Sequence, residues 1–377
     1  MVNSFLFKGL ALLTLCLFFV FDNIRLDIVL THMNPEDRFP FHRFYVLLAV
    51  FLFLANTRLV ANECLKNKSL LMLFLYIFVS MAWSSVPYGS FKTFFSQFTV
   101  MMVSIMVGLA YYENRRKIIK TLLVIFFIIV LLGMFASLFF PEIAVNTVSF
   151  GHPRWIGISD HPNEFGASAL VLIWLASNYY YIGSSKKLMI IAIAMSYYAI
   201  IMADSITSFI VSVAVAFYIF YCYKISNFNI LIKIFLFLFA ILFFIAFISF
   251  YKSFPDLIGA ALEAGGRNST LTGRTKLWHK AIVSMRGHWL FGYGYDNLKQ
   301  VTERQYKQMY QMSHIHNGYI ELLLKGGIFG WVLLGIVIIR TIYYQFKIRK
   351  KHRHEFVLLS SGLVMIFVHN FSQGGNY

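Results

Sequence analysis

The sequence predicts an all-α polytopic membrane protein, and three observations support this fold class. Hydrophobic residues make up 59% of the 377 residues, only 13% are charged, and the mean hydropathy is +0.68. A soluble domain carries roughly 25% charged residues. The apolar residues also gather into long runs that approach the roughly 20 residues a helix needs to cross a bilayer. We therefore expect a bundle of membrane-spanning helices.

Eleven apolar runs are candidates for these helices, and ten to twelve spans are expected. Nine runs lie within residues 1–250, which we predict to form one transmembrane bundle, and two lie within 316–377. Residues 251–315 form a large loop between them. The runs are 5–21, 43–61, 69–85, 93–112, 118–140, 164–182, 187–203, 207–223, 229–250, 318–343 and 356–371.

Lys and Arg gather in every second connection between these runs. Short loops rich in Lys and Arg stay in the cytoplasm, so we assign these connections and the N-terminus to the cytoplasmic face. This asymmetry accounts for part of the formal net charge of +17, so no nucleic-acid partner is expected. The cytoplasmic clusters lie at 58–68, 115–120, 186–187, 224–233 and 347–353, and the outward connections are 22–42, 86–92, 141–163, 203–206 and 251–315.

The loop 251–315 is basic, with nine Lys and Arg against four Asp and Glu. A loop of about 65 residues escapes the positive-inside rule, but a basic outer loop favours an anionic partner. Within it, 271–286 has apolar residues at helical spacing, which predicts an amphipathic helix on the membrane surface or capping the bundle. These residues are Leu277, Trp278, Ala281, Ile282 and Met285.

Two histidines and an asparagine, His314, His316 and Asn317, end this loop directly before an apolar run. A histidine at an outer interface can act as a general base near neutral pH, although the spacing alone favours a residue that caps the following helix. A metal site would need further ligands such as His152, His161 or Asp160. The three cysteines, Cys16, Cys64 and Cys222, are far apart, which argues against a disulfide framework or a zinc cluster.

Arginines in two outward connections are suited to binding a phosphate, which a guanidinium holds with two hydrogen bonds. Arg274 lies on the predicted amphipathic helix, with Arg267 and Lys276 nearby, although a solvated arginine fits this position as well. Arg154 has no local structural role that the sequence reveals. Pro162 is ordinary at a helix start, and Asp160 is the residue expected to cap that helix. His161, Asn163 and Glu164 complete this polar run.

Residues 292–297 read Gly-Tyr-Gly-Tyr-Asp-Asn. A nucleotide-binding loop needs a preceding strand and a following Lys-Ser/Thr, and both are missing here. Tyr295 and Asp296 in such a turn suit the hydroxyl groups of a sugar.

These segments together resemble the O-antigen ligase and polymerase superfamily. His316-Asn317 is followed after nine residues by Gly327 and then by Gly330, which is similar to the family signature at the end of its outer loop. The segment Gly273-Arg274…Trp278 and residues 290–294 resemble its stretch in the large periplasmic loop, and Arg154…Gly157…His161-Pro162-Asn163 resembles a third segment. The resemblance covers roughly residues 150–340 in consistent order.

The resemblance implies an inverting, metal-independent glycosyltransferase without a cofactor, with a GT-C-like fold. Its donor and acceptor would be oligosaccharides linked to undecaprenyl pyrophosphate, at the periplasmic face of a bacterial inner membrane. A chain-length-regulating co-polymerase is a further expected partner. Carried over by position, His316 is the base, and Arg274 and Arg154, with Arg267 and Lys276 close by, hold pyrophosphate. Asn317 orients His316 or the acceptor, and the other acceptor-side candidates are His314, His161, Asn163, Glu164, Tyr295 and Asp296.

Three enzymatic or transport functions remain open from the sequence, besides a non-catalytic assembly partner that would tolerate loss of His316. A Wzy-type polymerase is favoured over an O-antigen ligase because many ligases carry Ser-Arg at the turn before the eighth helix. This chain reads Asp204-Ser205-Ile206-Thr207-Ser208 there. A flippase or other transporter of lipid-linked oligosaccharides would show inverted repeats and a polar path, and neither is found. Ionisable residues are also nearly absent at mid-membrane depth, which disfavours a proton-coupled transporter.

Overall fold

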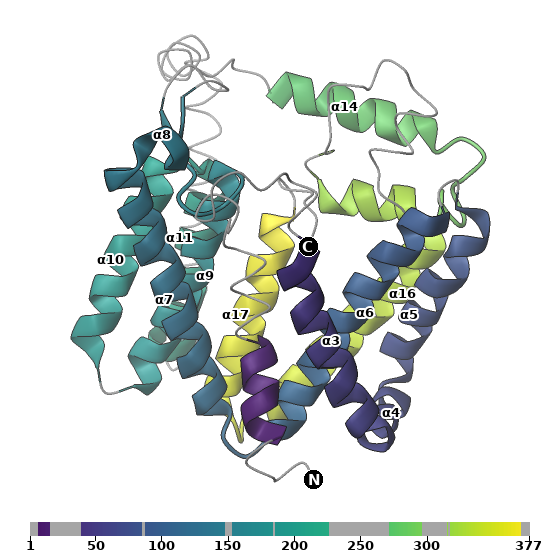
Figure 1. Ribbon diagram of the computed structural model, residues 1–377, viewed down its shortest axis with the longest axis horizontal. Helices are drawn as coiled ribbons and strands as arrows, with labels where there is room; N and C mark the ends of the chain where they lie inside the picture. The colour runs from purple at the N-terminus through teal and green to yellow at the C-terminus, as the bar shows by residue number, and fades with distance from the viewer. Residues whose placement is uncertain are drawn as a thin grey trace.

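The computed structural model describes residues 7–15, 39–84, 87–147, 153–183, 185–225, 271–295, 315 and 317–370. Most of these residues are helical, and the helices run side by side in a bundle with α14 lying across its upper end (Figure 1). The sequence-based expectation of a helical, multi-pass membrane protein is therefore confirmed.

The helices follow the apolar runs closely. Residues 7–15 form a helical segment. The longer elements are α3 (Phe39–Ala55), α4 (Thr57–Lys66), α5 (Lys68–Val79), α6 (Pro87–Ala110), α7 (Arg115–Phe139), α9 (Pro162–Ile182), α10 (Lys186–Met202), α11 (Ile206–Phe220), α14 (Leu271–Ser284), α16 (Gly318–Ile348) and α17 (Arg353–His369). The short ones are η2 (Ser80–Trp83), α8 (Pro141–Ala144), the π-helix η3 (Tyr221–Ile225), and the antiparallel pair β1 (Val145–Asn146) and β2 (Arg154–Trp155).

Two groups of helices pack around separate cores. In the first group α9 contacts α7, α10, α11 and α17, and its residues Phe165, Leu172 and Ile173 are fully buried. The second group consists of residues 7–15, α3, α4 and α6, which pack around Met102 and Met106 of α6. Figure 1 shows α17 between the two groups. The other C-terminal helix, α16, precedes α17 in the chain and contacts both α17 and α5.

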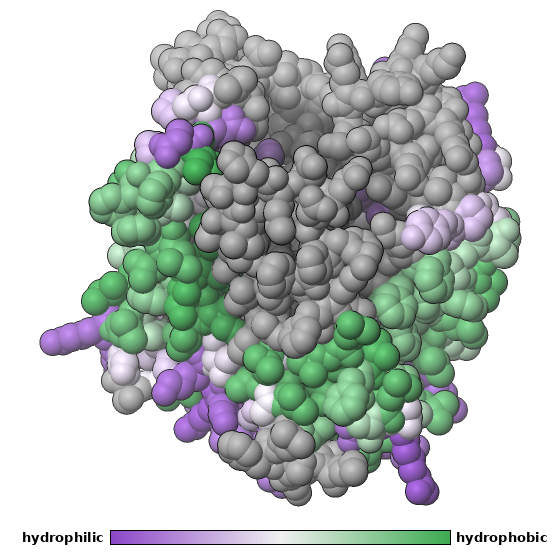
Figure 2. Space-filling view, in the orientation of Figure 1, coloured by the Kyte–Doolittle hydropathy of each residue, from purple (hydrophilic) through white to green (hydrophobic). Residues whose placement is uncertain are grey.

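The surface of the bundle carries a hydrophobic band with hydrophilic residues above and below it (Figure 2). In the described part, four helices are long and apolar enough to cross a bilayer: Arg115–Phe139, Pro162–Ile182, Ile206–Lys224 and Gly318–Ile348. The bent pair Leu47–Ala55 and Thr57–Lys66 makes a fifth if it counts as one span. The expected ten to twelve spans and the domain boundaries stay predictions, because run 229–250 and most of the loop 251–315 lie outside the described residues.

Two apolar runs that the sequence suggested as single helices are interrupted. The prediction of one helix over 43–61 is wrong, because the chain bends by 87° between α3 and α4. Asn56 lies at this bend and donates from Nδ2 to the Leu52 carbonyl, at 3.0 Å, and such side-chain bonds to the backbone compete with a regular helix. The helix predicted over 318–343 is broken at Gly327, where φ is 60° and ψ is −167°.

The basic connections lie together at the lower end of the bundle in Figure 1. Arg115 at the start of α7 forms an ion pair with Glu355 of α17. Arg353 donates to the carbonyl of Cys222 at 2.6 Å, and Arg340 donates to the carbonyl of Lys66 at 3.0 Å. We call this the basic end. The grouping expected from the charge pattern is therefore present, and the side of the membrane that it faces remains a prediction.

Candidate active site

The start of α16 is fixed by Asn317, which is the helix N-cap. Its Oδ1 accepts hydrogen bonds from the backbone N–H groups of Tyr319 and Ile320, at 3.0 and 3.1 Å. The N–H of Gly318 donates to the carbonyl of Asn370 at 3.0 Å, which ties this start to the end of α17. The cap of this helix is therefore Asn317, whereas the sequence favoured one of the two histidines for this role. His314 and His316, the predicted base, lie outside the described residues.

The break in α16 is filled by residues 288–293 of the loop that follows α14. The carbonyls of Trp289 and Leu290 accept from the N–H groups of Ile328 and Phe329, at 2.8 and 3.0 Å. In the other direction, the N–H of Tyr293 donates to the carbonyl of Leu324 at 2.8 Å. The loop thus caps both helix segments at the break, since each segment end leaves backbone groups unpaired. Two sequence segments that carried the resemblance therefore meet in space.

Close backbone contact explains the glycines of these two segments. A Cβ atom on Gly327 would lie 2.4 Å from the Leu290 carbonyl oxygen, and one on Gly292 would lie 2.6 Å from the Leu324 oxygen. Both glycines also have a positive φ, of 60° and 67°, which residues with a Cβ adopt only at a cost. These glycines therefore serve to join loop and helix, and residues 292–294 have a structural role there.

Tyr76 of α5 holds the same junction from a third element. Its hydroxyl lies 2.6 Å from the Gly326 carbonyl oxygen and 3.0 Å from that of Phe291. Its ring also packs near Gly330, where an added Cβ would lie 3.2 Å from the Tyr76 ring. One side chain thereby links α5, the loop and both sides of the break.

A cluster of polar side chains lies between Asn317 and the break. Glu321 is only 7% exposed, in the first turns of α16, where the helix dipole favours an anion. Lys325 lies one turn later, with Nζ 5.5 Å from the centre of the Tyr295 ring. Burial and, second, the charge of Glu321 raise the pKa of the Tyr295 phenol above its usual value. The Tyr295 N–H donates to Ser80 Oγ at 3.2 Å. The predicted sugar-facing Tyr295 thus lies in the same region as Asn317, beside a buried carboxylate.

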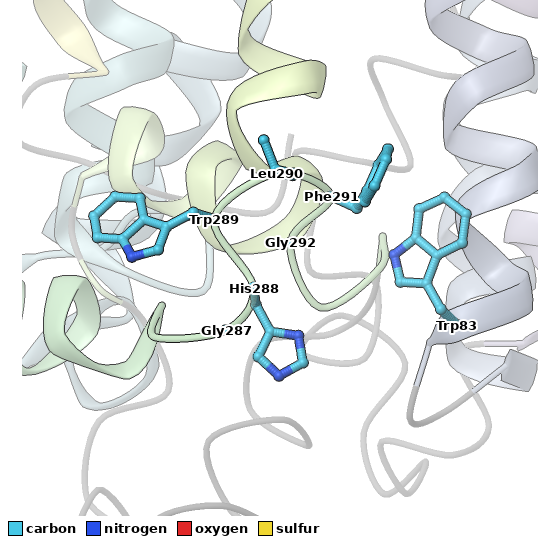
Figure 3. Close-up of a pocket in the computed structure, with 7 residues that line it drawn as sticks. All are labelled: Trp83, Gly287, His288, Trp289, Leu290, Phe291 and Gly292. Carbon is cyan, nitrogen blue, oxygen red and sulfur yellow. The ribbon is translucent and has the colours of Figure 1, made fainter.

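An open pocket of ≈ 580 Å³ adjoins this junction, lined by Trp83 and residues 287–292. Figure 3 shows the rings of Trp83 and Phe291 side by side, with Trp289 on the opposite side of the loop. The centroids of the first two rings are 5.9 Å apart. Leu290 and Phe291 are 63% and 53% exposed. The pocket is therefore apolar and aromatic, and suits a hydrocarbon chain better than a sugar.

Helix α14 covers this region, as the amphipathic pattern predicted. Ala281 and Met285 are buried against Tyr293 and Leu324, and Trp278 Nε1 donates to the Ile315 carbonyl at 3.0 Å. The helix forms a small core with the first part of α16. The backbones of Arg274 and Lys276 belong to α14, whereas their side chains, Arg267 and Asp296 lie outside the described part. Their predicted roles stay predictions.

Arg154 has a structural role that its sequence context did not reveal. Its Nε donates to the Ala203 carbonyl at 3.0 Å, and its Nη2 donates to the Asp204 carbonyl at 2.9 Å and to Asn163 Oδ1 at 3.2 Å. The guanidinium, which is 6% exposed, thus binds the end of α10, where a cation is favourable. Asp204 has a positive φ of 49°, so Arg154 also braces a strained turn. Direct contact of Arg154 with a phosphate stays a prediction.

His161 rather than Asp160 caps α9, which corrects the sequence-based assignment. His161 Nδ1 accepts from the N–H of Asn163 at 3.1 Å, so this nitrogen carries no proton. Glu164 Oε2 accepts from the N–H of Asp160 at 3.2 Å. An imidazole nitrogen and a carboxylate therefore accept from backbone N–H groups at this helix start. Within the described ranges, no three His, Cys, Asp or Glu side chains form a metal-binding group, and His152 is not among those residues.

The candidate residues thus fall into two places in the described structure. Asn317 and Tyr295 both lie along the first part of α16, where Asn317 caps the helix and Tyr295 faces Lys325. Arg154 and Asn163 are bonded to each other beside the turn between α10 and α11, and His161 and Glu164 lie next to them at the start of α9. The sequence argument missed Tyr76 and Glu321. For Glu321 a signal was present, since this acid lies in the first turns of an apolar helix and four residues before Lys325.

The comparisons with known proteins agree with this junction. The family described as O-antigen ligase matches residues 188–335, a stretch that includes α14, Asn317 and the break in α16. An uncharacterized protein of Haemophilus influenzae is 29% identical over 128 residues, which are 32% of each chain. The exopolysaccharide production protein ExoQ of Rhizobium meliloti is 35% identical over 105 residues. That alignment covers 26% of this chain and 23% of ExoQ.

These matches confirm the similarity to the O-antigen ligase and polymerase superfamily. The chain spans about a third and about a quarter of the length of these two relatives. Residues 154–164 lie before the stretch that the family matches, so their resemblance to the third segment stays a prediction.

Proposed function

We propose that this protein is a polysaccharide polymerase of the Wzy type. It would transfer a growing glycan from undecaprenyl pyrophosphate to the non-reducing end of a lipid-linked repeat unit, at the periplasmic face of the inner membrane. The product would be an O-antigen, a capsule or an exopolysaccharide. The similar protein ExoQ is an exopolysaccharide production protein, which favours the last class.

One observation carries this proposal: two of the three segments that resemble the family form a single junction. The loop 288–293 closes the break at Gly327, and Asn317 begins the same helix about three turns earlier. The residue before Asn317 is His316, so the chain delivers the candidate base to the point where the apolar helix ends. A lipid-linked donor must react at such a boundary, because its chain stays in the bilayer and its pyrophosphate stays outside.

The reaction needs a base and a stabilised leaving group. In the proposed step, neutral His316 removes the proton of the acceptor hydroxyl while its oxygen forms a bond to the anomeric carbon of the donor. The bond from that carbon to the phosphate oxygen breaks, and undecaprenyl pyrophosphate leaves with the electron pair. A positioned base contributes roughly 10²–10⁴-fold to such a step. Arg274, with Arg267 and Lys276, would stabilise the negative charge that develops on the leaving group.

The turn between α10 and α11 has a proposed role in binding the donor pyrophosphate, and Arg154 supports it. Many ligases resembling this chain carry an arginine at that turn, and this sequence lacks it. The structure has the guanidinium of Arg154 at the same turn, bonded to the carbonyls of Ala203 and Asp204. We infer that Arg154 replaces the missing arginine, by shaping the turn and adding positive charge near the donor pyrophosphate.

The apolar pocket at Trp83 and Phe291 fits the lipid part of the donor. Its aromatic walls lie beside the break in α16, next to exposed Leu290. An isoprenoid chain in this pocket would place its pyrophosphate toward the start of α16.

The decisive test is His316→Ala, expressed in a strain that lacks the gene. We expect loss of long-chain glycan at normal protein levels. Long chains at normal length would show that His316 is not the base. Asn370→Ala, which keeps the backbone carbonyl that accepts from Gly318, is the matched control near the same helix start, and it should retain the long chains.

An O-antigen ligase is the second candidate, because that is the description of the matching family. The gene deletion separates the two. Loss of a polymerase leaves a single repeat on the lipopolysaccharide core or abolishes the capsule. Loss of a ligase leaves the core bare while lipid-linked polymer accumulates. A flippase would instead tolerate His316→Ala and would leave repeat units on the cytoplasmic face when deleted.

A further inference from the structure

The basic end carries cations that come together from several helices. Arg115 forms an ion pair with Glu355 from the start of α7, and Arg353 donates to the carbonyl of Cys222 in η3. Lys350 and Lys351, in the turn between α16 and α17, are exposed. Hydrophilic side chains project from the lower edge of the molecule in Figure 2. The other exposed cations of this end include Arg116, Lys117, Lys120, Lys186, Lys187, Lys224, Lys347 and Arg349.

The cations at the starts of α7 and α10 lie at positions where they lower the stability of the helix. The first turns of α7 and α10 begin with Arg115 and Lys186, each followed by another cation, and neither turn contains an acid. A cation at a helix N-terminus opposes the helix dipole. The N-cap residues of α7, α10 and α17 (Asn114, Ser185 and His352) also form no side-chain capping bond. Helix starts without a side-chain cap and positive side chains therefore share one surface, an arrangement that attracts anions.

Aromatic side chains place this surface at the depth of lipid headgroups. Tyr112 is 68% exposed and its ring lies 4.7 Å from the Arg115 guanidinium. Tyr343, Tyr344 and Phe346 at the end of α16 are exposed as well. Tyrosines are enriched at both membrane–water interfaces. The basic end thus adjoins the hydrophobic band of Figure 2 at the level where phosphate groups of phospholipids lie.

We propose that the basic end, centred on the starts of α7 and α17 and the turn 349–352, binds the phosphate headgroups of anionic phospholipids. The positive-inside rule accounts for the number of cations on one side of the membrane. It does not account for their position in the first turns of uncapped helices. A phosphate group pairs with the exposed cationic side chains, and the positive ends of the helix dipoles favour it at the same place. The site lies at the opposite end of the bundle from the candidate active site, so it is independent of the proposed function.

The test uses the full-length protein in a nonionic detergent, with phosphatidylglycerol or phosphatidylcholine added in mixed micelles. Retained lipids are counted by native mass spectrometry, and the unfolding temperature is followed during the titration. We expect phosphatidylglycerol to bind and to raise the unfolding temperature. Each cation near an anionic surface contributes about fivefold in affinity, so Lys350→Gln with Lys351→Gln should weaken binding about 25-fold. Raising the ionic strength from about 0.1 to about 1 M should weaken it too.

The matched control is Lys280→Gln with Arg286→Gln, which removes the same charge from exposed positions on and directly after α14, at the opposite end of the bundle (Figure 1). It should leave phosphatidylglycerol binding unchanged. Equal weakening by both pairs would overturn the site and leave only diffuse charge attraction. Equal retention of phosphatidylcholine, or equal stabilisation by inorganic phosphate, would overturn the assignment to anionic lipid. Either pair tests lipid binding alone, whereas His316→Ala tests only glycan transfer.

Discussion

Replacing Gly327 by alanine tests whether the break in α16 is the structural basis of the candidate site. The new Cβ would lie 2.4 Å from the Leu290 carbonyl oxygen, at a φ of 60°. With ψ at −167°, this conformation is populated almost only by glycine, and it costs roughly 1–3 kcal/mol for a residue with a Cβ. Moving the loop away also weakens the bonds from Ile328 and Phe329, each worth about 0.5–1.5 kcal/mol. We therefore expect a loss of about 2–5 kcal/mol in the free energy of unfolding.

The matched control for this substitution lies in the same helix. Gly335 has no atom within 4 Å of an added Cβ, and alanine favours a helix interior over glycine by about 1 kcal/mol. Gly335→Ala should therefore keep or raise stability. Unfolding in mixed micelles measures both variants, and glycan length in the deletion strain gives their activity. Equal stability and glycan length for Gly327→Ala and Gly335→Ala would refute the proposed role of the break.

Three further predictions concern the side chains around this junction. Asn317→Ala should destabilise the start of α16 by about 1 kcal/mol and shorten the glycan. Asn317→Asp keeps a capping oxygen, so its effect should be milder. Hydrogen exchange of the first-turn amides of α16 measures the destabilisation. Tyr76→Phe removes only the hydroxyl and should cost about 1–3 kcal/mol of unfolding free energy, because carbonyls of the break lose their donor; no change would remove Tyr76 from the junction. Because the pKa of Tyr295 is higher in the folded protein than in the unfolded chain, its neutral phenol stabilises the fold. This contribution is fully present below about pH 10, and it is lost as the pH rises through the pKa of the folded state. Glu321→Gln should lower that pKa, and ultraviolet difference titration against Tyr295→Phe would detect the shift.

The helices were largely predictable from the sequence because lipid imposes one rule on every span. Long apolar runs must satisfy their own backbone bonds, so the bounds of α7, α9 and α10 agree with the runs to within a few residues. Interruptions were not predictable in this way. Hydropathy does not show that the Asn56 side chain bends the chain, or that a distant loop replaces the helix bonds at Gly327.

The candidate site was predictable only where it depends on residue type at a fixed spacing. The motif around Asn317 and the glycines indicated which segments matter, and the family match agrees with it. The role of Arg154 depends on the Ala203 and Asp204 carbonyls, about 50 residues away in the chain. The link made by Tyr76 spans 250 residues to Gly326. Such contacts come from packing, which no local pattern encodes.

The break in α16 has a consequence for the order in which the chain is assembled. Residues 288–293 precede Gly327, so the ribosome makes the loop before the helix whose break it closes. Without the loop, four backbone groups at Trp289, Leu290, Ile328 and Phe329 would lack their mutual partners, and unpaired groups in lipid cost several kcal/mol each. The loop must therefore be available on its own side of the membrane when α16 inserts. We expect translocation of this loop to precede insertion of α16 and α17.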